Sequence, residues 1–205
     1  MDLFGEPSDV WQRIALPGAD LRWIPQWLAP DEADRWLAEL RSSIAWEVHR
    51  IRIFGREVDS PRLSCWIGDA DASYTYSRTR FEPHPWTAVL SALRERVEAA
   101  CETHFNSVLA NLYRDGNDSM GWHSDDETEL GAQPIIASVS LGTARVFRFR
   151  SYSAKTKPHS LTLPHGSLLC MSGQTQYRYQ HELPRMRGLT GVRVSLTFRT
   201  VVQDR

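Results

Sequence analysis

Hydrophobic residues follow helical spacing in two segments of the first half of the chain, and this spacing predicts two helices. The first helix begins at residues 30–32, Pro-Asp-Glu, where acidic side chains in the first turn interact favourably with the helix dipole. The second spans residues 86–105. The apolar stripes are Ala33, Trp36, Leu37 and Leu40 in the first helix, and Val89, Leu93, Val97, Ala100 and Cys101 in the second.

From residue 107 onward the pattern changes to short strands separated by turn residues, among them Gly116, Gly142 and Gly166. The expected strands are 107–114, 134–141, 144–150, 159–163, 167–172, 175–181 and 191–201. Many short strands that follow two helices are typical of a double-sheet jelly roll with helices against one sheet. We therefore expect a mostly-β fold with flanking helices, a double-stranded β-helix.

The rest of the first half of the chain is predicted to be irregular or extended. Residues 1 to about 20 are expected to be irregular, and 46–54 to be extended with a turn at Gly55. Tyr74, Tyr76, Arg78 and Arg80 then alternate along a predicted strand. Interleaved aromatic and basic side chains suit a nucleic-acid groove. The alternative is a surface hairpin with a solvated basic face.

Composition narrows the class of protein. The 205 residues fit one domain, 1–205, and the net charge of −1 means that any nucleic-acid surface must be local. Cys65, Cys101 and Cys170 have no paired spacing, which favours a reducing compartment over a disulfide framework or a zinc ribbon. Because there is no apolar leader and no long apolar run, we expect a soluble intracellular protein, cytoplasmic or nucleoid/nuclear, that contacts no membrane.

The candidate metal ligands are His123, Asp125 and the distant His181. Two imidazoles and one carboxylate make the facial triad of non-haem Fe(II) oxygenases, which leaves coordination positions open. On a strand or at its end, residues two apart point to the same side, so His123 and Asp125 can bind one ion together. The alternative is chance, since a His-x-Asp triplet is common.

Two strands supply candidate anion-binding groups. In 192–199, Arg193, Ser195, Thr197 and Arg199 alternate with apolar residues. The two arginines lie roughly 20 Å apart at about 3.3 Å per residue. Both side chains can lean inward and hold a short dicarboxylate between them, because the planar fork of an arginine pairs with carboxylate oxygens in bidentate fashion. Upstream, an amide and a phenol hydroxyl share one face in Asn111-Leu112-Tyr113. The alternatives are an exposed strand with solvated arginines and a buried, satisfied tyrosine.

From about residue 20 to residue 201 the chain resembles the AlkB family of Fe(II)- and 2-oxoglutarate-dependent nucleic-acid dealkylases. The pieces that carry the resemblance are Asn111-Leu112-Tyr113-Arg114-Asp115-Gly116, His123-Ser124-Asp125-Asp126-Glu127, Ala137-Ser138-Val139-Ser140-Leu141-Gly142 and Arg193-Val194-Ser195-Leu196-Thr197-Phe198-Arg199. Phe54-Gly55-Arg56, Pro61-Arg62 and Tyr74-Thr75-Tyr76-Ser77 resemble the eukaryotic-type branch that repairs double-stranded DNA. The chain departs from that branch at Cys65-Trp66 and at Ser195.

The resemblance implies a catalytic site in a jelly-roll core, 107–201, under a nucleotide-recognition lid built from an N-terminal α/β extension with hairpins at 45–82. Fe(II) would be held by His123, Asp125 and His181. The co-substrate 2-oxoglutarate would be bound by Asn111, Tyr113, Arg193, Ser195, Thr197 and Arg199. Substrate contacts would come from Phe54, Gly55, Arg56, Arg62, Tyr74, Tyr76, Asp126 and Glu127.

The activity implied is oxidative demethylation of bases such as N1-methyladenine and N3-methylcytosine in DNA, with O2 and 2-oxoglutarate consumed and succinate, CO2 and formaldehyde released. The expected partner is DNA, duplex or single-stranded, or RNA, and the protein is expected to be a monomer. Two alternatives remain: an oxygenase of the same fold that acts on RNA or protein, and a module that reads damage without chemistry. An intact triad argues against the second, since such a module needs no iron ligands.

Overall fold

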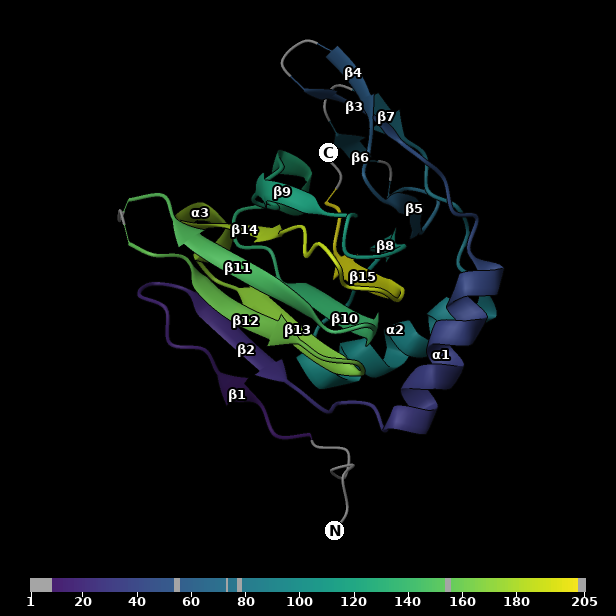
Figure 1. Cartoon of the computed structure of the whole chain (residues 1–205), viewed down its shortest axis with the longest axis horizontal. Helices are drawn as coiled ribbons and strands as arrows, with labels where there is room; N and C mark the ends of the chain where they lie inside the picture. The colour runs from purple at the N-terminus through teal and green to yellow at the C-terminus, as the bar shows by residue number, and fades with distance from the viewer. Residues whose placement is uncertain (1–8, 54–55, 73, 77–78, 154–155, 203–205) are drawn as a thin grey trace.

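The computed structural model describes residues 9–53, 56–72, 74–76, 79–153 and 156–202, and its centre is a pair of antiparallel sheets (Figure 1). In these residues the larger sheet has the strand order β1-β2-β13-β10-β15-β8-β5 and the smaller sheet β12-β11-β14-β9. The larger sheet consists of β1 Gln12–Arg13, β2 Asp20–Ile24, β13 Ser167–Ser172, β10 Ile136–Gly142, β15 Arg193–Arg199, β8 Ser107–Tyr113 and β5 Leu63–Gly68. The smaller consists of β12 His159–Leu163, β11 Arg145–Ser151, β14 Tyr179–Leu183 and β9 Met120–His123.

Buried apolar side chains from both sheets pack in the layer between them. Leu21, Leu169 and Ile136 come from the larger sheet, and Phe149 and Leu163 come from the smaller one. The burial of these side chains removes apolar surface from water, which is the main force that holds two sheets together. The two facing sheets confirm the expected jelly roll.

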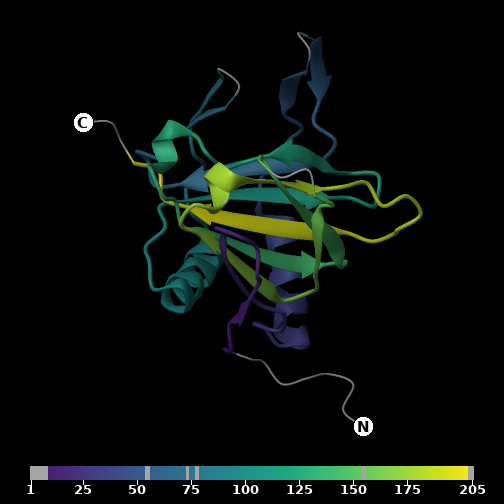
Figure 2. The ribbon, with the colours of Figure 1, turned by 90° about the vertical axis from the view of Figure 1, so that its left-hand side faces the viewer.

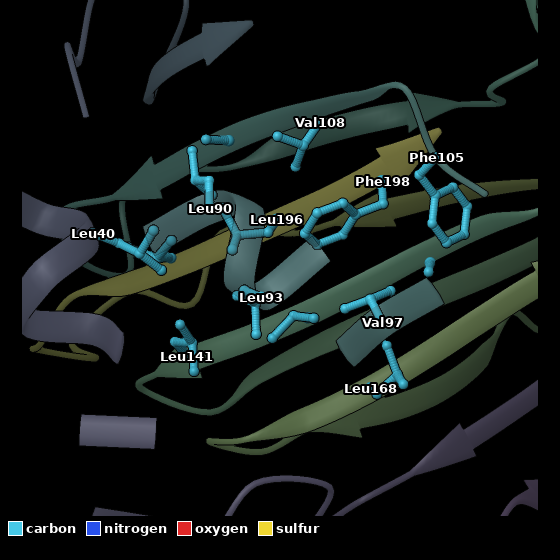
Figure 3. Packing of buried hydrophobic residues seen from close by; sticks show 14 of the residues in the cluster. Leu40, Leu90, Leu93, Val97, Phe105, Val108, Leu141, Leu168, Leu196 and Phe198 are labelled. Atoms are coloured by element: carbon cyan, nitrogen blue, oxygen red, sulfur yellow. The ribbon is translucent and has the colours of Figure 1, made fainter. Parts of the chain in front are cut away.

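Two helices cover the outer face of the larger sheet (Figure 3). The α2 helix, Ala88–Cys101, begins where the Thr87 side chain accepts a hydrogen bond from the Leu90 backbone N–H, and its residues Leu93 and Val97 are fully buried. The α1 helix, Pro30–Ser43, carries proline and acidic residues in its first turn, as its sequence predicts, and buries Leu40. Both helices contribute to one core cluster with the apolar face of β15.

The alternation along β15 separates the core from the candidate site. Val194, Leu196 and Phe198 are buried among the helices, while Arg193 and Arg199 project from the opposite face of the strand. These arginines are only 2% and 3% exposed, so the alternative of solvated arginines on an open face is excluded.

Two hairpins stand out from one end of the sandwich, at the top of Figures 1 and 2. They are β3–β4, Arg50–Ile53 with Arg56–Asp59, and β6–β7, Tyr74–Tyr76 with Thr79–Phe81. The first is joined to the jelly roll just after β4, where the Ser119 N–H donates to the Pro61 carbonyl at 3.1 Å. Because Ser119 immediately precedes β9, this hairpin is anchored beside the strand that ends at His123.

Four local expectations differ from the structure. The segment from Tyr74 to Arg80 was expected to form one strand, but β6 and β7 pair there as an antiparallel hairpin. Residues 175–181 were expected to form one strand, but α3, Thr175–Arg178, precedes β14 because the Thr175 hydroxyl donates to the Ser172 carbonyl and starts a turn. The expected irregular lead contains the short edge strand β1, paired with β2. The strand β9 was not predicted as an element. No helix in the described ranges is both long and apolar enough to cross a membrane.

Candidate metal centre

His123, Asp125 and His181 come together at one end of the smaller sheet. His123 ends β9 and lies directly opposite His181 on β14, and Asp125 follows two residues after the strand. One potential ligand atom from each residue lies within 4.8 Å of the others. The Asp125 carboxylate oxygens are 4.0 Å from His123 Nε2 and 3.8 Å from His181 Nε2. The structure therefore brings together the three residues that the sequence singles out as candidate ligands.

Neighbouring groups fix the orientation of these ligands. His123 Nδ1 lies 2.8 Å from the Gly121 carbonyl, which can only accept, so Nδ1 carries the proton and Nε2 keeps its lone pair. Arg199 Nη2 donates to Asp125 Oδ1 at 2.7 Å. The Asp125 backbone N–H donates to the Gln176 side chain at 3.0 Å, which holds the loop after β9 against α3.

Burial and neighbouring charges set the protonation states of the three candidate ligands. Burial raises the pKa of Asp125, but the charge of Arg199 and the two histidines outweigh it and hold that pKa at about 2. Burial and the neighbouring His123 lower the pKa of His181 to about 3, and burial also lowers the pKa of His123. At neutral pH the centre therefore presents one ionised carboxylate and two neutral imidazoles, which are the protonation states that a metal ion requires.

A partly open cavity extends from the metal centre to Arg193 on β15. Arg193 Nη2 donates to the Ser140 hydroxyl at 2.8 Å and to the Ser195 hydroxyl at 3.4 Å, and its guanidinium lies 5.3 Å from the Tyr113 ring centroid. Residues that line the cavity are Leu109, Asn111, Tyr113, Met120, His123, Asp125, Ser138, Phe147, Met171, His181, Leu183, Arg193, Ser195, Thr197 and Arg199. All six expected co-substrate residues are in this set.

The expected substrate residues are placed less completely. Arg62 is buried, and its Nε donates to Asn111 Oδ1 at 2.7 Å, so it joins the segment after the first hairpin to the cavity wall. Asp126 is exposed and Glu127 is half-buried, and neither lines the cavity. The structure gives Arg56, Tyr74 and Tyr76 as strand residues only, and Phe54 and Gly55 lie outside the described residues.

Ser138, Ser140 and Gln176 contribute to the site but were not among its predicted residues. Ser138 and Ser140 alternate with apolar residues on β10, and the Ser138 hydroxyl lies 3.3 Å from that of Ser195 on the neighbouring strand. The same alternation that identified Arg193 and Ser195 could have identified this pair. Gln176 had no such signal, because it lies on the unexpected helix α3.

The donor set fits both an iron ion and a dicarboxylate. Three ligands that leave coordination positions open suit Fe(II), as in facial-triad sites. At the other end, Arg193 Nε is buried and has no hydrogen-bond partner among the described residues, which suits a carboxylate ligand. A jelly roll with these two features belongs to the class of non-haem iron oxygenases.

Comparison with known proteins identifies the family. The model of the 2OG-Fe(II) oxygenase superfamily matches residues 20–199. The protein labelled DNA oxidative demethylase ALKBH2 of Homo sapiens is 36% identical over 202 residues, which are 94% of this chain and 77% of that protein. The chain therefore belongs to the 2OG-Fe(II) oxygenase superfamily and, within it, to the AlkB homologues, whose metal is Fe(II) and whose co-substrate is 2-oxoglutarate.

Other relatives support the same family. Alpha-ketoglutarate-dependent dioxygenase alkB homolog 3 of Mus musculus is 42% identical over 188 residues, which cover 84% of this chain and 63% of that protein. This chain spans 61% to 65% of the length of the alkB homolog 3 proteins it matches. A solved structure titled OsALKBH1 superimposes with a TM-score of 0.64 at 18% identity, over 93% of this chain and 100% of the other, which supports the fold.

Proposed function

We propose that this protein is an Fe(II)- and 2-oxoglutarate-dependent dioxygenase that removes methyl groups from alkylated bases in DNA. The observation that carries the proposal is one cavity with the His123–Asp125–His181 triad at one end and the buried Arg193 at the other. A 2-oxo dicarboxylate has a metal-chelating keto-acid end and a distal carboxylate, so it suits a cavity with these two ends.

The proposed roles follow from the contacts of each residue. His123 and His181 would bind the metal through Nε2, and Asp125 through Oδ2, because Oδ1 accepts the hydrogen bond from Arg199. Arg193 would bind the distal carboxylate, with Ser140 and Ser195 holding its guanidinium in place. Asn111, Tyr113 and Thr197 complete the walls of the co-substrate pocket.

The protein's contribution to the chemistry is placement and the exclusion of water. When bound, Fe(II) and 2-oxoglutarate supply the oxidation: O2 and 2-oxoglutarate give succinate and CO2, and the substrate methyl carbon gains a hydroxyl group before it leaves as formaldehyde. Phe147, Met171 and Leu183 line the cavity with apolar surface around the triad. This lining limits the access of bulk water to the reacting centre.

We propose an alkylated base in DNA as the substrate because relatives of this chain carry the names DNA oxidative demethylase and alkB homolog. A base must leave the stack to reach a buried metal. A ring-methylated adenine or cytosine is cationic, so carboxylates at Asp126 and Glu127, directly after the metal ligand, would favour it over the normal base. The hairpins at 50–59 and 74–81 would contact the nucleic acid beside β9.

We further propose that the protein acts as a monomer inside the cell. Cys65, Cys101 and Cys170 are all buried and unpaired as disulfides, which fits a reducing compartment. Light scattering on the purified protein tests the oligomeric state, and a stable dimer would contradict this part of the proposal.

The test of the proposed function is a substrate panel with succinate and formaldehyde as readouts. The panel contains N1-methyladenine and N3-methylcytosine in duplex DNA, in single-stranded DNA and in RNA, together with unmethylated strands and a methyl-lysine peptide. Formaldehyde release that requires a methylated base and DNA supports the proposal. Turnover on RNA or peptide alone would identify a different oxygenase of the same fold, and no turnover on any substrate would contradict enzymatic activity.

A further inference from the structure

Arg145, the first residue of β11, is a buried arginine that binds two loops at once. Its side chain is 1% exposed and is among the largest that the described residues bury completely. Nη1 donates to the Asp115 carbonyl at 3.1 Å, and Nη2 donates to the carbonyls of Asp118 and Pro184, both at 2.8 Å. A planar guanidinium can hold three fixed acceptors in this way, whereas a lysine ammonium on a flexible stem cannot do so as rigidly.

The two loops bound by Arg145 lie next to the expected co-substrate residues in sequence. Tyr113 ends β8 just before the loop at 114–119, and Arg193 begins β15 just after the loop at 184–192. The two residues are direct partners across the β8–β15 ladder. Arg145 therefore fixes the chain on either side of this pair.

The loops are also in close contact with each other. The Gly116 N–H donates to the Leu189 carbonyl at 2.9 Å, and the Met186 N–H donates to the Gly116 carbonyl at 2.8 Å. A Cβ atom at Gly116 would lie 2.0 Å from the Met186 carbonyl oxygen, so only glycine allows this approach. The two loops are thus closely packed against each other, and Arg145 is the polar side chain that bonds to both of them.

Arg145 also adds positive charge to the Arg193 end of the cavity. The guanidinium carbons of Arg145 and Arg193 lie 5.7 Å and 5.3 Å from the same Tyr113 ring centroid. Neither arginine has a carboxylate within salt-bridge distance in the part of the chain that the structure describes. Asp118, which is held by Arg114 at 2.8 Å, and Asp115 nevertheless lie close enough to stabilise the charge of Arg145. No carboxylate compensates Arg193 in the same way, and a buried cation without a counter-ion is unfavourable unless an anion binds to it.

The effect of this charge is visible on Arg193 itself. Burial lowers the pKa of Arg193 to about 10; Arg145 contributes to the lowering, and Tyr113 opposes it. Arg145 is therefore close enough to influence the electrostatics of the residue expected to bind the distal carboxylate. A bound dianion would relieve the repulsion between the two guanidiniums.

We propose that Arg145 is a positioning residue for the co-substrate: it fixes the strand ends at Tyr113 and Arg193 and, together with Arg193, provides the positive potential that a dicarboxylate neutralises. The identity of the dicarboxylate as 2-oxoglutarate rests on the proposed function. Arg145 acts through its neighbours, because it does not line the cavity.

The test is calorimetric titration of 2-oxoglutarate, without O2 and with Mn(II) in place of Fe(II), into four proteins. These are the wild type, Arg145→Met, Arg145→Lys and the matched control Arg148→Met, an exposed arginine on the same strand whose contact is Glu182. Arg145→Met keeps the length of the side chain but loses its charge and donors, and Arg145→Lys keeps the charge alone. Mn(II) affinity without 2-oxoglutarate and the melting temperature are measured on each protein.

We expect Arg145→Met to bind 2-oxoglutarate at least about tenfold more weakly, which is about 1.4 kcal/mol, with Arg145→Lys intermediate and Arg148→Met unchanged. Mn(II) affinity should stay within about threefold of the wild type, since His123 and His181 are aligned by the β9–β14 pairing itself. An unchanged 2-oxoglutarate affinity, or equal losses for 2-oxoglutarate and Mn(II), would overturn the positioning role. A wild type that binds Mn(II) but no 2-oxoglutarate would instead contradict the proposed function.

Discussion

At the scale of single residues, the site is built on two buried charged groups, Asp125 and Arg193, whose contacts differ. Asp125 is the negative centre, and it is bound by Arg199 and flanked by two imidazoles. Arg193 is the positive centre at the other end, and its contacts are hydroxyl groups rather than carboxylates. A metal ion bound at Asp125 and a carboxylate of a dianion bound at Arg193 would each bring a charge opposite to that of the residue that binds it.

Replacing Arg193 with alanine should weaken the binding of 2-oxoglutarate because the distal carboxylate loses its charged partner. The distal carboxylate would lie unpaired in a buried pocket, and truncating one partner of such a pair costs roughly 2–5 kcal/mol. Titration with 2-oxoglutarate in the presence of Mn(II) measures the change, with Arg193→Lys expected to recover part of the affinity. If Arg193→Ala binds as tightly as the wild type, the distal carboxylate lies elsewhere.

The lowered pKa of Asp118 predicts how the stability of the folded protein depends on pH. Burial raises its pKa, but hydrogen bonds from the Arg114 side chain and backbone outweigh burial and hold the pKa below its ordinary value. A carboxylate with a lowered folded-state pKa stabilises the protein fully above its unfolded-state pKa, about 3.9, and this contribution is lost as pH falls through the folded-state value. Asp118→Asn should therefore be less stable than the wild type at pH 7, by roughly 1–3 kcal/mol.

Thermal melts between pH 7 and pH 3 test this expectation. The difference in melting temperature between the wild type and Asp118→Asn should shrink as pH falls below about 4. Glu39→Gln, which changes an exposed carboxylate on α1, serves as the control and should melt like the wild type at each pH. A difference that stays constant down to pH 3 would mean that Asp118 stabilises the fold by packing alone.

At the scale of secondary-structure elements, the alternation of side chains along a strand places core residues on one face and site residues on the other. On β15 one face belongs to the helical core and the other carries Arg193, Ser195, Thr197 and Arg199. The β3–β4 hairpin, in contrast, has exposed residues such as Val58 and is joined to the jelly roll near β9. An element that packs little of its own core is free to contact a large ligand.

The position of Phe54 in the sequence of the β3–β4 hairpin leads us to expect that its replacement changes the repair rates of duplex and single-stranded DNA to different extents. Phe54 lies outside the described residues, but the sequence places it at the turn between β3 and β4, beside Gly55 and among three arginines, Arg50, Arg52 and Arg56. If its ring fills the gap left by a flipped base, Phe54→Ala should reduce repair of duplex DNA far more than repair of a single strand. Val58→Ala, an exposed change on the same hairpin, should leave both rates unchanged.

Rates on matched duplex and single-stranded oligonucleotides, together with the melting temperature, distinguish the two possible roles of Phe54. A wedge has little effect on stability, so the melting temperature should barely change. Equal losses on both substrates, or a large fall in melting temperature, would indicate a core residue and remove the main reason for proposing repair of duplex DNA.

At the scale of the whole molecule, the two sheets and two helices bring together residues that are far apart in sequence. His123 and His181 are separated by most of the jelly roll, yet they pair across β9 and β14. Tyr113 and Arg193 pair across β8 and β15 in the same way. The metal end and the anion end of the cavity therefore lie on different sheets, and the packing between the sheets sets the distance between them.

The sequence predicted the parts of this arrangement that depend on local periodicity. The alternation of residues 192–199 predicted both the buried face of β15 and the polar face that carries Arg193. Local periodicity could not predict that Arg199 binds Asp125 while Arg193 is held by serine hydroxyls, because these contacts depend on strand register. It likewise missed α3, since a hydrogen bond from Thr175 overrides the strand pattern there.

Demethylase activity is tested most directly when succinate and formaldehyde are measured together, with a methylated DNA oligonucleotide, Fe(II), 2-oxoglutarate and O2. For the wild type we predict about one formaldehyde per succinate, because each turnover oxidises one methyl group. For Asp125→Ala we predict loss of both products without loss of fold, since the change removes the charged ligand of the triad. Normal succinate release by Asp125→Ala would mean that Asp125 is not a metal ligand, and succinate release by the wild type without formaldehyde would mean that the protein does not demethylate DNA.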